Sequence, residues 1–224
     1  MQFCRKIKDE KLGLHFWMHG IAFYMDGFEF KRNPKEAART PSAMEWMKEG
    51  ETLNFGCTAK GKKEGVNNAN FMVGIAPGRG VVLCEQYFGT ITGAKMAAIA
   101  TVALEDAYSK CTLPCSRTIL QDNCPRQNSA AAMVAFARHR TLIFPIPARS
   151  PDLNPIENFF NLVKRMLKLQ ARVGNIQEET FDEFSARCSS TMKAYPADKI
   201  DDIIKSMPKR INMVLKAKGQ RIKY

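Results

Sequence analysis

The stretch RSPDLNPIENFFNLVKRML, Arg149 to Leu167, joins a proline-rich turn to an apolar pattern with helical spacing. Ile156, Phe159, Phe160, Val163, Met166 and Leu167 fall on one helix face. This periodicity predicts a strongly amphipathic helix that begins just after the turn. Asn154, Pro155 and Glu157 would occupy its N-cap, N1 and N3 positions, a capping-box arrangement. Taken alone, this pattern favours helix capping by Glu157 over a role in a chemical site.

Short strands and helices alternate along the rest of the chain. An apolar run over residues 21–30 predicts a strand with Asp26 embedded in it, and a turn at residues 77–80 predicts a hairpin. The predicted elements that follow this first strand are strands Phe71–Ala76 and Val81–Tyr87, helix Thr92–Lys110, strand Arg117–Gln121, helix Ser129–Arg140 and strand Thr141–Ile146. The order predicts an α/β fold with an antiparallel first half and a parallel second half.

Three acids should meet at one edge of this sheet. Asp122 follows a predicted strand, and the helix that begins beside Glu157 should return to the same edge after a right-handed crossover. Asp26 joins them if its strand is parallel to the one before Asp122. Three carboxylates repel one another unless they are protonated or bind a cation. Two Mg²⁺ ions roughly 4 Å apart can hold the attacking and leaving oxygens of a phosphoryl transfer.

The charge balance favours a polyanionic partner. The chain has 224 residues, 34 Lys and Arg against 22 Asp and Glu, and a formal net charge of +12. Such a surface attracts nucleic acid, although a merely basic protein is the alternative. Seven irregularly spaced cysteines indicate free thiols in a reducing compartment. No apolar run is long enough to span a bilayer, and the first residues lack the apolar core of a signal peptide, so we expect no membrane partner.

Basic residues near the expected site are the candidate DNA contacts. The loop Cys57–Asn70 is either a solvated connection or a DNA contact, and the basic tail from Lys209 to Lys223 is either a phosphate-binding helix or a solvated face. The residues that we expect to contact DNA are Lys60, Lys62, Lys63, Arg126, Arg149, Lys164, Lys209 and Arg210.

Three segments closely resemble the catalytic half of mariner-superfamily transposases, which are Asp-Asp-Glu recombinases of ribonuclease H-like fold. These segments are LQDNCPRQNSAAA (residues 120–132), ARSPDLNPIENFFNLVKRML (148–167) and SMPKRINMVLKAKGQRIKY (206–224). The 34 residues between Asp122 and Glu157 match the spacing of the second and third acids in the family's glutamate branch. FYMDGFEF places Asp26 as the first acid, and the resemblance covers nearly the whole chain.

The resemblance implies cut-and-paste transposition, in which water frees a 3′-hydroxyl at the element end and that hydroxyl attacks target DNA, usually at a TA site. Asp26, Asp122 and Glu157 would be the catalytic residues and would hold two Mg²⁺ or Mn²⁺ ions. Asn123 would be a neighbour in the second motif, and Asn154 would orient the loop before Glu157. The implied partners are transposon ends, target DNA and a second copy in a homodimer, and the implied location is the nucleus.

The chain departs from the family pattern at three places. Gln127 stands where the family generally has a histidine, and Gly27 stands where an acid is common. The helix-turn-helix domains that read the terminal repeats do not precede the first acid. We therefore expect residues 1–16 to be a linker remnant, 17–170 the ribonuclease H-like core with a mixed five-stranded sheet and flanking helices, and 171–224 a helical extension packed on it. The alternative function is an inactive or domesticated module that binds DNA or protein.

Overall fold

The computed structural model describes residues 1–32, 68–112, 116–147, 150–173, 179–220 and 222. Five strands form one mixed sheet in the order β3-β2-β1-β4-β5. They are β1 (Phe23–Lys31), β2 (Asn68–Ala76), β3 (Gly80–Tyr87), β4 (Thr118–Gln121) and β5 (Leu142–Pro145). β1, β2 and β3 pair antiparallel, whereas β1, β4 and β5 pair parallel. The predicted antiparallel first half and parallel second half are confirmed.

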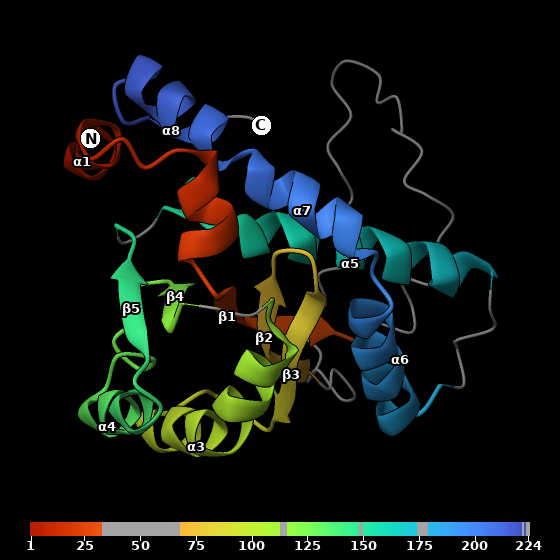
Figure 1. The fold of residues 1–224 in the computed structure, drawn as a ribbon. Coiled ribbons are helices and arrows are strands. Elements are labelled where there is room, and N and C mark those ends of the chain that lie inside the picture. Colours follow the sequence, from red (N-terminus) through yellow and green to blue (C-terminus); the bar gives the residue numbers. More distant parts are fainter. Residues whose placement is uncertain (33–67, 113–115, 148–149, 174–178, 221, 223–224) are drawn as a thin grey trace, which may run out of the picture.

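Helices cover both faces of the sheet (Figure 1). The helices are α1 (Gln2–Asp9), α3 (Gly93–Lys110), α4 (Ala130–Arg138), α5 (Pro155–Val173), α6 (Phe181–Lys193), α7 (Ala197–Lys205) and α8 (Met207–Lys216). Alternate residues of β1 enter two separate cores, because successive side chains of a strand point to opposite faces. Phe23 and Met25 pack in the core beneath α3 and α4. Tyr24 and Phe30 pack in the core beneath α5 and the C-terminal helices, which is therefore the face that Asp26 shares.

The two ends of the chain lie against each other, with α1 packed on α8. Within residues 1–16 the helix α1 ends at Asp9, and a π-helical turn follows at Phe16–Gly20. Pro196 directly precedes α7, and Pro208 lies in the first turn of α8, a position where its missing N–H costs no helical hydrogen bond. None of the described helices is long and apolar enough to cross a membrane.

Candidate active site

The sheet register brings Asp26 and Asp122 together. The parallel ladder between β1 and β4 ends with the pair Met25 and Gln121, so Asp26 and Asp122 are the next residues on the two chains. Asp122 follows the end of β4, as predicted. Asp26 lies inside β1, as predicted, because β1 continues to Lys31 in its pairing with β2. Asp26 lies at the carboxyl edge of the parallel part of the sheet because its neighbour β4 ends at Gln121, one residue before Asp122.

Asp26 is nearly enclosed, with an exposed fraction of 9%. Its Oδ1 accepts hydrogen bonds from the backbone N–H of Gly27 at 2.7 Å and from Gln127 Nε2 at 3.2 Å. Its Oδ2 accepts one from Asn154 Nδ2 at 3.0 Å. Gln127 and Asn154 are themselves 3% and 1% exposed. Two buried amide side chains therefore fix the orientation of this carboxylate.

Glu157 lies in the first turn of α5 and is half-buried. The capping box proposed for this helix start does not form. The backbone N–H of Asn154 donates to the carbonyl of Pro151 at 3.1 Å, and Asn154 Oδ1, the atom that would cap the helix, accepts no hydrogen bond from the described residues. The side chain of Asn154 turns to Asp26 instead. Helix capping therefore does not explain the Glu157 carboxylate.

The three carboxylates influence one another electrostatically. The pKa of Asp26 is raised to about 7, chiefly because the carboxyl is buried. The charges of Glu157 and Asp122 add to this rise, and the hydrogen bonds from Gln127 and Gly27 oppose it. Burial also raises the pKa of Glu157, with Lys164 opposing and Asp122 adding to the rise. Like charges have this effect only when they lie close together. Asp26, Asp122 and Glu157 therefore lie near enough to influence one another at this edge of the sheet, and we refer to them as the acid cluster.

The cluster fits a hard divalent cation in its chemistry. All three side chains offer oxygen, the donor that Mg²⁺ prefers. Gln127 Oε1 and Asn154 Oδ1 add two buried oxygens that accept no hydrogen bond in the described part of the chain. In these same ranges, no three His, Cys, Asp or Glu side chains are arranged to hold a metal ion. The residue types thus suit the ion, whereas both oxygens of Asp26 are engaged by amide donors.

The remaining predicted site residues have different surroundings. The backbone N–H of Asn123 donates to Asp122 Oδ1 at 2.7 Å. Arg126, Lys164 and Lys209 are exposed, and Lys164 Nζ lies 4.5 Å from the centre of the Phe28 ring. The loop residues Lys60, Lys62 and Lys63, together with Arg149, lie outside the described residues.

The prediction that Arg210 contacts DNA is wrong. Arg210 is 2% exposed, and its guanidinium donates to groups inside the protein, the carbonyl of Asp152 among them. A phosphate cannot reach a side chain in this position.

Gln127 and Gly27, which depart from the family pattern, are neighbours in space. A Cβ atom at Gly27 would lie 3.2 Å from the Tyr87 hydroxyl and 3.7 Å from Gln127 Nε2. The space of an acidic side chain at position 27 is therefore taken by these two groups. Sequence reasoning identified Gln127 as unusual but missed its hydrogen bond to Asp26, and it missed Tyr87 altogether. The pKa of Tyr87 is raised by burial and then by the charge of Asp26, which places this phenol near the cluster.

Comparisons with known proteins agree with the geometry. Residues 23–179 match a family model described as DDE superfamily endonuclease. The Tcb1 transposase of Caenorhabditis briggsae is 30% identical over 117 residues, covering 52% of this chain and 41% of that protein. The Tc1 transposase of Caenorhabditis elegans is 34% identical over 104 residues, covering 46% and 36%. The matched segments span less than half the length of these relatives.

A solved structure shares the fold. The Mos1 transposase paired-end complex with left transposon end superimposes with a TM-score of 0.70 at 17% identity, covering 99% of this chain and 60% of that one. At this identity the likeness establishes the ribonuclease H-like fold, with its mixed five-stranded sheet and flanking helices.

Proposed function

Since this chain belongs to the DDE superfamily endonucleases, as a catalytic domain of mariner-superfamily type, we propose that it hydrolyses DNA phosphodiester bonds and transfers the freed 3′-hydroxyl to target DNA. The observation that carries the proposal is that Asp26 and Asp122 follow the last paired residues of the parallel ladder between β1 and β4, while the charge of Glu157 also acts on Asp26. Burial beside two other acids raises the pKa of Asp26 to about 7, so ionising this carboxyl is unfavourable in the folded protein. A fold retains such an unfavourable group where its charge is used.

In this proposal, the three acids hold Mg²⁺ or Mn²⁺ ions, two of them during the reaction. Bound ions would activate the attacking oxygen and stabilise the leaving oxygen of an in-line displacement. Support comes from the Mos1 paired-end complexes, which have been solved with Mg and with Mn. Gln127 and Asn154 orient the Asp26 carboxylate, and the backbone N–H of Asn123 orients Asp122.

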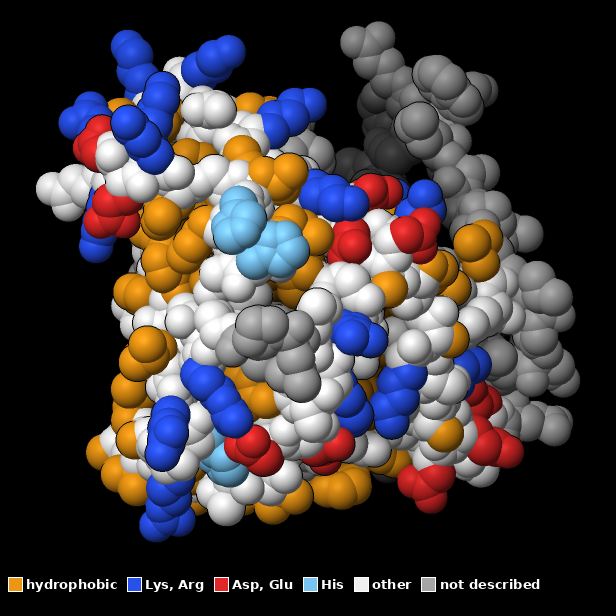
Figure 2. All heavy atoms as spheres, viewed as in Figure 1, with side chains coloured by type: hydrophobic (Ala, Val, Ile, Leu, Met, Phe, Trp, Pro, Cys, Tyr) orange, Lys and Arg blue, Asp and Glu red, His pale blue; other side chains and the backbone are white. Residues whose placement is uncertain are grey.

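The proposed substrate is double-stranded DNA, comprising transposon ends and a target that is usually a TA site. The net charge of +12 supports a polyanionic partner. Lys and Arg side chains stand out from the surface where α1 and α8 meet (Figure 2). Lys164 lies on α5 close enough to Glu157 to lower its pKa, so a phosphate bound there would lie beside the acids. Action as a homodimer and in the nucleus belong to the same proposal.

A plasmid-nicking assay tests this function without knowledge of the repeat sequence. Supercoiled plasmid with Mn²⁺ should be converted to nicked circles whose 3′-hydroxyl ends a DNA polymerase can extend. Asp122→Asn and Glu157→Gln should both abolish the conversion while retaining plasmid binding. Equal nicking by the variants would identify a contaminating nuclease. Binding without nicking by the unaltered protein would favour the alternative, a domesticated DNA-binding module.

A further inference from the structure

Arg210 places a buried cation beneath the segment that carries Glu157. It projects from α8, and its Nε donates at 2.7 Å to Oγ of Ser206, the residue that joins α7 to α8. Arg210 Nη2 lies 3.5 Å from the carbonyl oxygen of Ile203 in α7, and Nη1 faces the turn between β5 and α5. A guanidinium with an exposed fraction of 2% must find its partners inside the protein, because an unsatisfied buried donor is costly.

The guanidinium contacts this segment on both sides of Glu157. Arg210 Nη1 lies 3.4 Å from the carbonyl oxygen of Asp152 and 3.4 Å from Asn158 Oδ1. Asn154, which donates to Asp26, lies between these two contacts along the chain, as does Glu157 itself. One side chain thus bridges the 3-10 turn Pro151–Leu153 and the first turn of α5.

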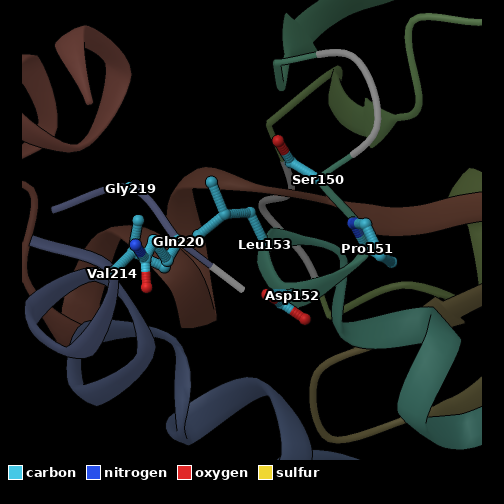
Figure 3. A pocket seen from close by; sticks show the side chains of 7 residues that line it. All are labelled: Ser150, Pro151, Asp152, Leu153, Val214, Gly219 and Gln220. Carbon is cyan, nitrogen blue, oxygen red and sulfur yellow. The ribbon is translucent and has the colours of Figure 1, made fainter. Parts of the chain in front are cut away.

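A second contact joins the same turn to the end of the chain. The backbone N–H of Ile222 donates to Asp152 Oδ2 at 3.0 Å, and both residues are buried. A cavity of about 350 Å³ separates the turn from the C-terminal segment beside these contacts. Figure 3 shows Ser150 to Leu153 on one side of it and Val214, Gly219 and Gln220 on the other.

We propose that Arg210 is a positioning residue that holds the segment from Asp152 to Asn158 so that Glu157 and Asn154 meet Asp26. The inference rests on the proposed function, since it assigns α8 a role in assembling the acid cluster. The planar fork of arginine can donate to two acceptors at once, which a lysine ammonium on a flexible stem cannot reproduce in the same geometry. Groups that orient ligand residues typically change metal affinity by about 10–100-fold when they are removed.

The test compares Arg210→Gln and Arg210→Lys with the unaltered protein, and Lys205→Gln serves as a control that removes an exposed cation from the neighbouring helix α7. Hydrogen–deuterium exchange reports on residues 150–158 and, for comparison, on β2. Calorimetry reports the affinity for Mn²⁺. Arg210→Gln should speed exchange in residues 150–158 about tenfold, leave β2 unchanged and weaken Mn²⁺ binding about tenfold. Arg210→Lys should restore only part of both properties, and Lys205→Gln should match the unaltered protein.

Unchanged exchange in residues 150–158 of Arg210→Gln would overturn the inference. Faster exchange with unchanged Mn²⁺ affinity would also overturn it, because the contact would then be structural only. If neither the unaltered protein nor Asp26→Asn binds Mn²⁺, the proposed function is contradicted, and the positioning role that rests on it is contradicted as well. If Arg210→Gln does not fold, Asn158→Ala removes a single acceptor of the guanidinium and is measured in the same two ways.

Discussion

Asn154 Nδ2 donates a hydrogen bond of 3.0 Å to Asp26 Oδ2, across 128 positions of the sequence. This bond joins the first strand of the sheet to the turn before α5. It explains why the start of α5 is not capped by Asn154, whose amide faces the sheet instead of the helix. The motif that looks like a helix start is, in the folded chain, an attachment point for the first acid.

The stability of the protein should depend on pH through Asp26. Its pKa is about 7 in the folded protein and near 3.8 without the fold, so the folded state keeps a proton that the unfolded chain has lost. Stability should therefore fall as pH rises from about 4 to about 7. Asp26→Asn removes this titration, so its stability relative to the unaltered protein should rise across that window, by up to ~4 kcal/mol. Urea unfolding of both proteins at several pH values measures the difference, and a pH-independent difference would contradict the burial of an ionisable Asp26.

Gln127 should set the pH at which metal binds. Its hydrogen bond lowers the pKa of Asp26, so Gln127→Leu should raise that pKa and move the midpoint of Mn²⁺ binding to higher pH. Calorimetric titrations over a pH series give the midpoint. Gln86→Leu replaces an exposed glutamine on β3 and should leave it unchanged. A midpoint that stays in place in Gln127→Leu would mean that the amide does not influence the Asp26 carboxyl.

Lys164 should contribute to DNA binding next to the acids. It is exposed on α5 above the Phe28 ring and lowers the pKa of Glu157. Lys164→Gln should weaken binding to any duplex and reduce the slope of log K against log salt by about 0.9, the value for one phosphate contact. Lys110→Gln, which removes a cation paired with Asp106 at the end of α3, is the control. Equal slopes for the two variants would exclude a specific phosphate contact at Lys164.

The capping box of α6 should contribute to stability independently of the acid cluster. Thr180 Oγ1 accepts from the backbone N–H of Glu183, and the Glu183 carboxylate accepts from the backbone N–H of Thr180. Thr180→Ala should lower the free energy of unfolding by about 1 kcal/mol. Ser190→Ala, at an exposed position inside the same helix, should be neutral or stabilising because alanine favours helix. Thermal unfolding distinguishes the two, and an equal effect would refute the cap.

The sheet could be predicted from the sequence because its strands are short apolar runs bounded by clear turns. The approach of Asp122 and Glu157 to the same edge of the sheet could be predicted as well, because a βαβ unit brings the chain back to that edge. Other features depend on contacts between distant segments. Gln127 bonds to Asp26 from a loop 101 residues away, and the Tyr87 hydroxyl lies close to Gly27, where a side chain would crowd it. In the sequence, Arg210 lies in a basic tail and is expected at the surface. In the structure it is buried, because α8 packs against the turn that contains Asp152.

Calorimetric titration of Mn²⁺ into the unaltered protein, Asp122→Asn and Glu157→Gln tests the central claim most directly. It should be carried out at about pH 8, above the pKa of about 7 of Asp26, so that the carboxylate form predominates. The account predicts binding to the unaltered protein and binding weakened about tenfold or more in both variants, because each variant removes one oxygen ligand. Equal binding by all three proteins would contradict the account, since it would show that the ion is held elsewhere than by the three acids.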